Sequence, residues 1–438
     1  MNDGKVLWKT FVFVCCILLG YPIDSHAQSC NGSLGDPIVN QTFGAGRLGA
    51  LTAEQTTYKY VSTNCANDGE YTLASAVNPA CFYGTWHRLT EDHTPGDKDG
   101  NMLVVNASHG AGEFYKQQVT GLCGGTTFEF SVWIVNLMSL RTPSVPCVLR
   151  QVDPNITMRI ETTDGTLIKA IDTGTIERTG SAAWKRFAAL FTLPSGTSSV
   201  VLRLVNNEIG GCGNDLALDD IQFRPCGPLL QASFGVGSAA DTVLCSNSEL
   251  VINSSLGSGY SNPSFQWQES KDGKAWTDIA GANTPVYTVN TTIPQKKYYR
   301  LVSAEAENIR NSQCRAVSTA LTVTTCACVL TTYLDMYVPT VFTPNDDRVN
   351  DTFDIYVSQS VPVDLKIYNR WGSVVFATAT MDQKWDGNYL DRPCPPGDYT
   401  WEVNYEITDF KNLQGRSRAA AECPLRKVTQ QGHILLLR

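Results

Sequence analysis

Alternating apolar and polar residues predict β-strands along most of the chain. In residues 128–134, 156–160 and 200–204 every second residue is apolar, which is typical of strands with one buried face. Gly, Asn, Asp or Pro bounds each segment, and no long stretch with a 3.6-residue period follows residue 27. Many short strands without intervening helices predict an all-β protein built of antiparallel sandwiches.

The N-terminus has the pattern of a secretory signal peptide. Lys5 and Lys9 precede an apolar run at residues 11–20, and residues 25–27 offer small side chains before a cleavage point. The run is about half of the roughly 20 apolar residues that cross a bilayer, so a membrane anchor is the weaker alternative. We expect residues 1–27 to be removed and the mature chain to be exported without a transmembrane span.

Two breaks in the strand pattern divide the mature chain. The pattern lapses at residues 224–228 and again at residues 325–331, and three domains suit a chain of this length. The predicted domains are residues 28–228, 229–325 and 326–438, the last beginning with a short linker.

The composition limits the kind of binding partner and the cellular compartment that we expect. The chain has 34 Lys and Arg against 42 Asp and Glu, a net charge of −8, and no dense basic run, so nucleic acid is not an expected partner. Thirteen of its 15 cysteines follow the signal peptide, which suits an oxidising compartment. Because thirteen is odd, one thiol stays free or pairs between chains. We predict two disulfides within domains, Cys245 with Cys314 and Cys394 with Cys423. The reason is that each pair contains the only cysteines of its strand region.

Five short motifs follow one another in the C-terminal domain. They are VPTVFTPN, NDTF, IYNRWG, KWDG and PGDY, at residues 338–345, 350–353, 367–372, 384–387 and 396–399. In this order they resemble the gliding motility-associated C-terminal domain, the type B sorting domain of type IX secretion. The resemblance implies that the outer-membrane type IX machinery is a partner and delivers the chain to the cell surface or the medium. An ordinary sandwich with packed aromatics is the alternative.

One of these motifs predicts a hairpin. Residues 369–372 (NRWG) lie between two apolar strands, and Gly372 suits a position that needs a positive φ. Trp371 and Trp385 are then expected in the core or on the sheet surface.

An acidic loop in the same domain is a candidate calcium site. Closely spaced Asp and Asn oxygens suit a hard cation, and residues 345–351 resemble the family's Asn-Gly-Asp-Gly-x-Asn-Asp segment, although Asp346 and Arg348 replace its two glycines. The candidate ligands are Asn345, Asp347 and Asp351; a solvated turn is the alternative.

The middle domain resembles bacterial immunoglobulin-like repeats. A strand carrying Trp267, a turn at residues 271–274 and a strand with Tyr298 and Tyr299 follow one another, as in an Ig-like β-sandwich with an inward Trp. This resemblance implies a spacer or an adhesive module.

The N-terminal domain resembles a carbohydrate-binding-module jelly roll, chiefly through the ending LDDI at residues 218–221. In such sandwiches an acidic residue of the last strand often holds a structural calcium. The resemblance therefore implies metal ligands at Asp219 and Asp220, with oxygens added by Asp97 and Asp99. Solvated turn residues are the alternative.

Sugar binding needs an aromatic platform flanked by hydrogen-bonding side chains. Trp133 lies out of phase with its apolar neighbours, as do Arg159, Glu161 and Arg203, so these four are the candidate ligand-binding residues if they share one sheet face. An ordinary outer face is the alternative.

Catalytic signals are weak. The spelling Gly-x-Gly-x-x-Gly at residues 44–49 lacks a βαβ setting. Asp92-His93 with Tyr115 resembles the acid–base pair of a lyase or hydrolase, but one His near one Asp in a polar loop is more often structural. We therefore predict a non-catalytic adhesin or glycan-binding protein that binds a polysaccharide or another surface ligand. A polysaccharide-degrading enzyme and a structural surface component are the alternatives.

Overall fold

The structure is a computed structural model that describes residues 29–46, 49–110, 112–140, 151–235, 240–326, 336–357, 363–380, 382–408 and 425–438. The predicted signal peptide lies outside these residues. In the described part the chain is almost wholly β, with one short turn each of α-helix (α1, Cys81–Gly84) and 3-10 helix (η2, Ser312–Cys314), so the all-β prediction is confirmed. No helix found there is long and apolar enough to span a membrane.

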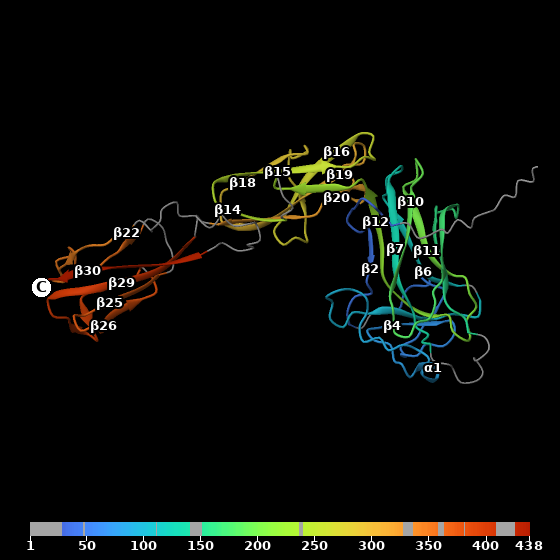
Figure 1. Cartoon of the computed structure of the whole chain (residues 1–438), viewed down its shortest axis with the longest axis horizontal. Coiled ribbons are helices and arrows are strands. Elements are labelled where there is room, and N and C mark those ends of the chain that lie inside the picture. Colours follow the sequence, from blue (N-terminus) through green and yellow to red (C-terminus); the bar gives the residue numbers. More distant parts are fainter. Residues whose placement is uncertain are drawn as a thin grey trace, which may run out of the picture.

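The first sandwich packs two sheets face to face (Figure 1). The larger sheet contains β10 (Lys185–Thr192), β7 (Thr127–Asn136), β12 (Asp215–Gly227), β5 (Met102–Asn106), β4 (Glu70–Ala74) and β3 (Lys59–Tyr60), with β1 (Ser33–Leu34) and β2 (Val39–Gln41) also on β12. The smaller contains β6 (Glu113–Thr120), β11 (Ser199–Asn206), β8 (Asn155–Glu161) and β9 (Leu167–Thr175). Apolar residues of β7 such as Phe130 and Ile134 bury against Met158 and Leu202 of the facing sheet, which is the period-2 pattern that predicted these strands.

The outer face of the larger sheet is also covered. Trp86 and Leu89, from the segment between β4 and β5, bury against Val104, Val135 and Ala217 in a second apolar cluster. Strand β5 is therefore buried along its whole length and reads as a continuous apolar run.

The middle sandwich encloses a single buried tryptophan. One sheet contains β13 (Leu230–Ser233), β15 (Ser248–Leu256) and β18 (Tyr287–Thr291); the other contains β14 (Asp241–Cys245), β21 (Leu321–Cys326), β19 (Gln295–Glu305), β16 (Pro263–Ser270), β17 (Thr277–Asp278) and β20 (Ala316–Val317). Trp267 of β16 is fully buried, and its indole N–H donates to the Thr284 carbonyl at 3.0 Å. The inward Trp is what the sequence predicted.

The C-terminal domain is built on a long antiparallel pair, β29 (Gly397–Thr408) with β30 (Leu425–Leu436). Its main sheet adds β25 (Val363–Tyr368), β26 (Val374–Thr378) and β23 (Val341–Phe342), and two small pairs join β22 (Met336–Tyr337) to β24 (Tyr356–Val357) and β27 (Asn388–Tyr389) to β28 (Arg392–Pro393). The predicted hairpin at residues 369–372 is present, with Gly372 at φ 77°. Trp385 is buried in the core, whereas Trp371 is 83% exposed at the hairpin tip.

The disulfides differ from the predicted pairs. Cys123 of the first sandwich bonds to Cys314 of the second, so the predicted bridge from Cys245 to Cys314 is wrong, and Cys245 is itself disulfide-bonded. Cys394 is buried and bonds to no described cysteine. Its predicted partner Cys423 lies outside the described residues, so that bridge stays a prediction. Cys314 follows a turn that rests on the Gly121 loop of the other sandwich, where the Asn311 amide donates to the Gly121 carbonyl. That contact lies between domains and leaves no local sequence pattern. Two further bridges join Cys30 to Cys226 and Cys65 to Cys81.

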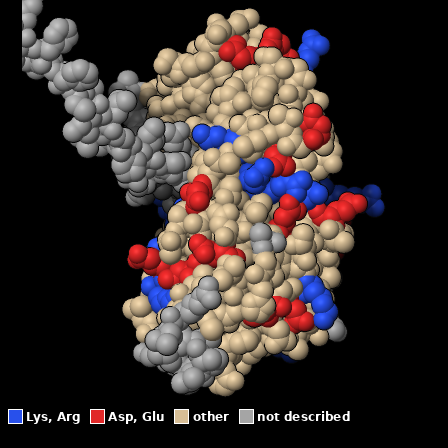
Figure 2. All heavy atoms as spheres, turned by 90° about the vertical axis from the view of Figure 1, so that its right-hand side faces the viewer, with Lys and Arg blue, Asp and Glu red and all other residues tan. Residues whose placement is uncertain are grey.

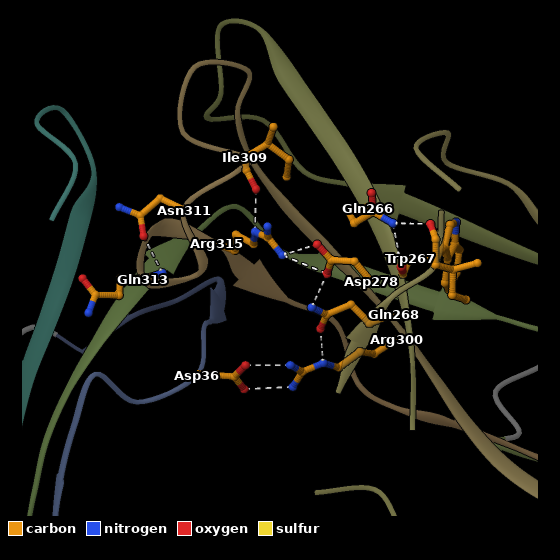
Figure 3. Close-up of polar contacts among 11 residues, drawn as sticks. Asp36, Gln266, Trp267, Gln268, Asp278, Arg300, Ile309, Asn311, Gln313 and Arg315 are labelled. Atoms are coloured by element: carbon orange, nitrogen blue, oxygen red, sulfur yellow. Dashed lines mark hydrogen bonds and ion pairs between the residues drawn. The ribbon is translucent and has the colours of Figure 1, made fainter. Parts of the chain in front are cut away.

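A chain of polar contacts joins the first two sandwiches (Figure 3). The Arg300 guanidinium donates twice to Asp36 of the first sandwich, at 2.8 and 2.6 Å, and stacks over the Trp276 ring at 4.2 Å. Gln268 accepts from Arg300 at 2.7 Å and donates to Asp278 at 2.7 Å, and Arg315 in turn pairs with Asp278 at 3.0 Å. Because the Arg300 side chain is only 8% exposed, this joint is partly desolvated, and charged hydrogen bonds of that kind are stronger than exposed ones.

Candidate functional site

Two carboxylates converge beneath the loop at residues 92–100. Asp92 is 8% exposed, and Oδ2 of Asp92 and Oδ1 of Asp97 are buried without a hydrogen-bond partner. A Cβ at Gly100 would lie 2.2 Å from the first of these atoms and 2.3 Å from the second, so only glycine leaves room for both. Burial, and after it the charge of Asp97, raises the pKa of Asp92 to about 6. When both carboxyls are ionised, these two buried oxygens carry negative charge without a donor to balance it.

The other predicted metal ligands of this domain have different roles. Asp219 is fully buried and accepts from the His93 and Asp220 backbone N–H groups, each at 2.8 Å; its burial raises its pKa to about 7. Asp220 contacts His93 Nδ1 at 2.7 Å and accepts from the Thr94 hydroxyl at 2.8 Å. These two carboxylates thus hold the turn that carries Asp92, while Asp99 is exposed at a positive φ of 60°.

This acidic site has few side chains that could bind a metal ion. Among the described residues no group of three or more His, Cys, Asp or Glu side chains is arranged to hold a metal ion. Calcium also takes backbone carbonyls and water as ligands, and a bridge between Ala45 and Gly100 brings the segment at residues 44–46 beside the carboxylate pair. The carbonyls of Gly44 and Gly46 in that segment accept from the Asn101 side chain, so the two carboxylates are the charged ligands that this site could offer to a cation.

The candidate acid–base residues are not brought together. Tyr115 lies on β6 in the core between the sheets, 1% exposed, and its hydroxyl donates to Gln117 at 3.4 Å. His93 lies on the outer face of the larger sheet, where its ring stacks on Trp133. No shared cleft contains Tyr115, His93 and Asp92.

The predicted ligand-binding residues lie on opposite faces of the first sandwich. Trp133 points outward from β7, and the His93 ring covers it with 3.9 Å between ring centroids, so this face of the indole is not free for a sugar ring. Arg159, Glu161 and Arg203 point outward from the other sheet. The condition for a joint binding site, that these four residues share one sheet face, is therefore not met, because the strands that carry them belong to different sheets.

The three charged residues form an ion network. Glu161 lies 2.7 Å from the Arg159 guanidinium and 2.9 Å from that of Arg203, which also pairs with Glu113. The end of the molecule that the first sandwich presents likewise shows acidic and basic groups side by side (Figure 2). All partners of these side chains lie on strands of the same sheet, so the network stabilises that sheet.

A loop at one end of the first sandwich presents an exposed aromatic. Tyr83 in α1 is 88% exposed, and both Phe82 and Tyr83 have positive φ angles, 50° and 62°. Such backbone costs about 1 to 3 kcal/mol per residue and persists only where the surroundings enforce it. The disulfide of Cys81 and the packing of Phe82 on Trp86, 5.0 Å between centroids, hold the loop in place.

A cavity opens beside this loop. Its volume is about 450 Å³, and its described lining residues are Pro79, Trp86, His87, Arg88, Ser139, Leu140 and Gly180. Tyr83 is not among these lining residues, but Pro79 and Trp86 lie on either side of its loop; we call Tyr83 and this cavity together the loop site. Sequence reasoning missed it, although residues 82–88 (FYGTWHR) concentrate aromatic and hydrogen-bonding side chains in the segment between β4 and β5.

The acidic loop of the C-terminal domain satisfies its own oxygens. Asp351 accepts from the backbone N–H groups of Asn345, Asp346 and Arg348 at 3.0, 2.8 and 2.7 Å, and Asp347 accepts from that of Val349 at 2.7 Å. Asp346 and Arg348 adopt positive φ angles in place of the glycines of the family pattern. Calcium binding by Asn345, Asp347 and Asp351 stays a prediction, without a buried partnerless oxygen to support it.

Comparisons with solved structures give only distant likenesses. Tailspike protein 4 of bacteriophage CBA120 is 13% identical over 39% of this chain and 19% of its own, with a TM-score of 0.24. The β-1,2-glucanase from Parabacteroides distasonis is 17% identical over 63% of this chain and 39% of its own, with a TM-score of 0.19. A CBM4 structure is 16% identical over 36% of this chain and 86% of its own, with a TM-score of 0.21. TM-scores this low carry no argument about function.

Family comparisons identify the C-terminal part of the chain. No curated protein matches, and residues 235–327 match a domain of unknown function (DUF8696). Residues 336–416 match the CHU_C Type IX secretion signal domain, in agreement with the ordered motifs and the β-structure of this region. The chain therefore carries a type IX secretion signal domain and is exported across the outer membrane to the cell surface or the extracellular space.

Proposed function

We propose that the exported chain is a non-catalytic carbohydrate-binding protein and that the loop site binds the sugar. The observation that carries this proposal is Tyr83, a large aromatic side chain that a strained and disulfide-held loop keeps in solvent. Sugar rings stack their apolar faces on aromatic rings, while nearby polar groups bond to their hydroxyls. The cavity, lined by Pro79 and Trp86 on either side of that loop, adds the exposed guanidinium of Arg88 as a donor for such hydrogen bonds.

The composition of the cavity favours binding over hydrolysis. Most glycoside hydrolases use two carboxylates that face each other across the scissile bond, about 5 to 9.5 Å apart. None of the described residues that line the cavity is Asp or Glu. The facing carboxylates Asp92 and Asp97 do not line this cavity, and one oxygen of each is buried beneath the loop at residues 92–100.

A structural calcium ion at Asp92 and Asp97 forms the second part of the proposal. Two buried carboxylate oxygens without donors are costly unless a cation compensates them, and Ca²⁺ prefers such oxygens. The ion holds the loop at residues 92–100, which His93 and Thr94 fasten to the last strand through Asp220.

A glycan array with the mature chain tests the proposal. We expect binding that Tyr83→Ala abolishes and that the control Tyr337→Ala leaves unchanged, since Tyr337 is also exposed, at 68%, but lies in the C-terminal domain. Absence of binding to every glycan would contradict a carbohydrate ligand. Release of reducing sugar from any polysaccharide on the array would instead contradict the non-catalytic assignment.

A further inference from the structure

The secretion signal domain presents large side chains around a cavity of about 280 Å³. Arg370, Trp371, Tyr389 and Arg392 line it, and Leu390 follows Tyr389 at the tip of the adjoining hairpin. Trp371 is 83% exposed, Leu390 77% and Tyr389 47%. We call these five residues the tip surface. Single exposed apolar residues are common, but a group of them beside a cavity marks an interaction site.

The first hairpin is built to hold Trp371 in solvent. The Asn369 side chain accepts from the backbone N–H groups of Trp371 and Ser373 at 3.0 and 2.9 Å. The Asn369 N–H donates to the Ser373 carbonyl at 2.9 Å, and Gly372 provides the positive φ that closes the turn. The indole makes no contribution to the core that Trp385 fills, so its exposure is not a by-product of folding the sheet.

The second hairpin stores strain at an exposed leucine. Leu390 and Asp391 form the two-residue turn between β27 and β28, and their φ angles are 50° and 58°. Turns of this kind favour Asn-Gly or Asp-Gly, because a side chain at positive φ is strained. A leucine in this place is therefore unfavourable for both backbone and solvation, which points to a role outside the folding of the domain.

We propose that the tip surface is the docking surface on which the type IX secretion machinery holds this domain. All five residues lie inside residues 336–416, the range that matches the secretion signal family. Trp, Tyr and Arg are the side chains that dominate the binding energy of protein interfaces.

The charges of the cavity indicate what the machinery presents to it. Arg370 and Arg392 line the cavity together with one carboxylate, that of Asp398, and Asp391 lies at the neighbouring turn. The lining therefore has an excess of one positive charge. A complementary partner surface is apolar and carries an acidic group that enters between the two guanidinium groups.

Export of the full chain from a bacterium with a type IX system tests this surface. We compare Trp371→Ala and Leu390→Gly with the control Tyr337→Ala, which removes an exposed aromatic elsewhere in the same domain. Leu390→Gly relieves the strained φ, so it preserves the fold while removing the apolar contact. We expect the amount of both tip variants at the cell surface and in the medium together to be about tenfold less than that of the wild type, with accumulation in the periplasm, which corresponds to the loss of one moderate interface residue.

Two outcomes overturn the proposal. One is wild-type export of both tip variants. The other is an equal export defect in Tyr337→Ala, which would show that any exposed aromatic of the domain has the same effect. Thermal unfolding of the periplasmic Leu390→Gly protein at or above the wild-type temperature shows that its defect is not one of folding.

Discussion

Replacing Asp92 by Asn is expected to have opposite effects on stability with and without calcium. The carboxyl of Asp92 faces that of Asp97 in a buried place, and its pKa rises from 3.8 to about 6. A carboxyl whose pKa is higher in the folded than in the unfolded state binds more protons when folded. Stability therefore falls as the pH rises from about 4 to about 6, and the cost stays constant above that range.

The size of the cost follows from the shift in pKa. About two pKa units correspond to about 3 kcal/mol at most, and solvent access to this site reduces the cost to about 1 to 3 kcal/mol. In chelator at pH 7.5, Asp92→Asn removes the cost of burying this charge and of its repulsion by Asp97, and is expected to stabilise the first sandwich by this amount. At pH 4 the two proteins should be equally stable. Asp215 and Asp219 also have pKa values raised to about 7, so the informative quantity is the difference between wild type and variant.

In calcium we expect the wild type to be more stable than Asp92→Asn, the opposite of the order in chelator. At a free concentration of about 100 times Kd, a bound ion stabilises the wild type by about 2.7 kcal/mol, whereas Asp92→Asn has lost one of the two charged ligands and should respond little. For a domain of this size, 1 kcal/mol shifts Tm by about 2 to 4 °C.

Thermal unfolding followed by circular dichroism, in chelator and in calcium at pH 4 and 7.5, measures all four states. Asp99→Asn is the matched control, because Asp99 lies in the same loop but is exposed, and it should change nothing. Equal destabilisation of Asp92→Asn in chelator and in calcium, or an undiminished response to calcium, would refute the assignment of the site.

Two further predictions concern the joint between the first two sandwiches. Cys123→Ser should remove about 2 to 5 kcal/mol of stability and separate one unfolding transition into two, which differential scanning calorimetry detects; a single unchanged transition would mean that the bridge does not couple the sandwiches. Asp36→Ala should cost about 1 kcal/mol in urea denaturation, because it leaves the buried Arg300 guanidinium without a carboxylate. The same substitution in an Arg300→Met background should cost less, and equal costs in both backgrounds would show that the two side chains are not coupled.

Local sequence patterns correctly predicted the strands and the turn whose structure depends on residues close in sequence. Period-2 alternation located strands such as β7 and β8 because one face of each is buried in the sandwich core. The turn at residues 369–372 was predictable because its backbone demands fall on Asn369 and Gly372 themselves.

The predictions that were wrong concern contacts between residues that are distant in sequence. Trp133 and Arg203 each alternate correctly with apolar neighbours, yet the choice of sheet is made by strand pairing between β7 and β12 and between β11 and β8. The bridge between Cys123 and Cys314 spans 191 residues and two domains. The acidic pair was half predicted: Asp97 was chosen as a ligand, while its neighbour Asp92 was considered only as a catalytic acid.

The joint between the first two sandwiches also determines how the molecule bears tension. A ligand held at the loop site and a machinery or surface that holds the C-terminal domain would pull on opposite ends of the chain shown in Figure 1. Cys314 is bonded to Cys123, and Arg300 is hydrogen-bonded to Asp36. The pulling force is therefore transmitted between the sandwiches by these two cross-links as well as by the peptide at residues 228–230. A protease that cut that peptide would leave the two sandwiches covalently attached through the bridge between Cys123 and Cys314.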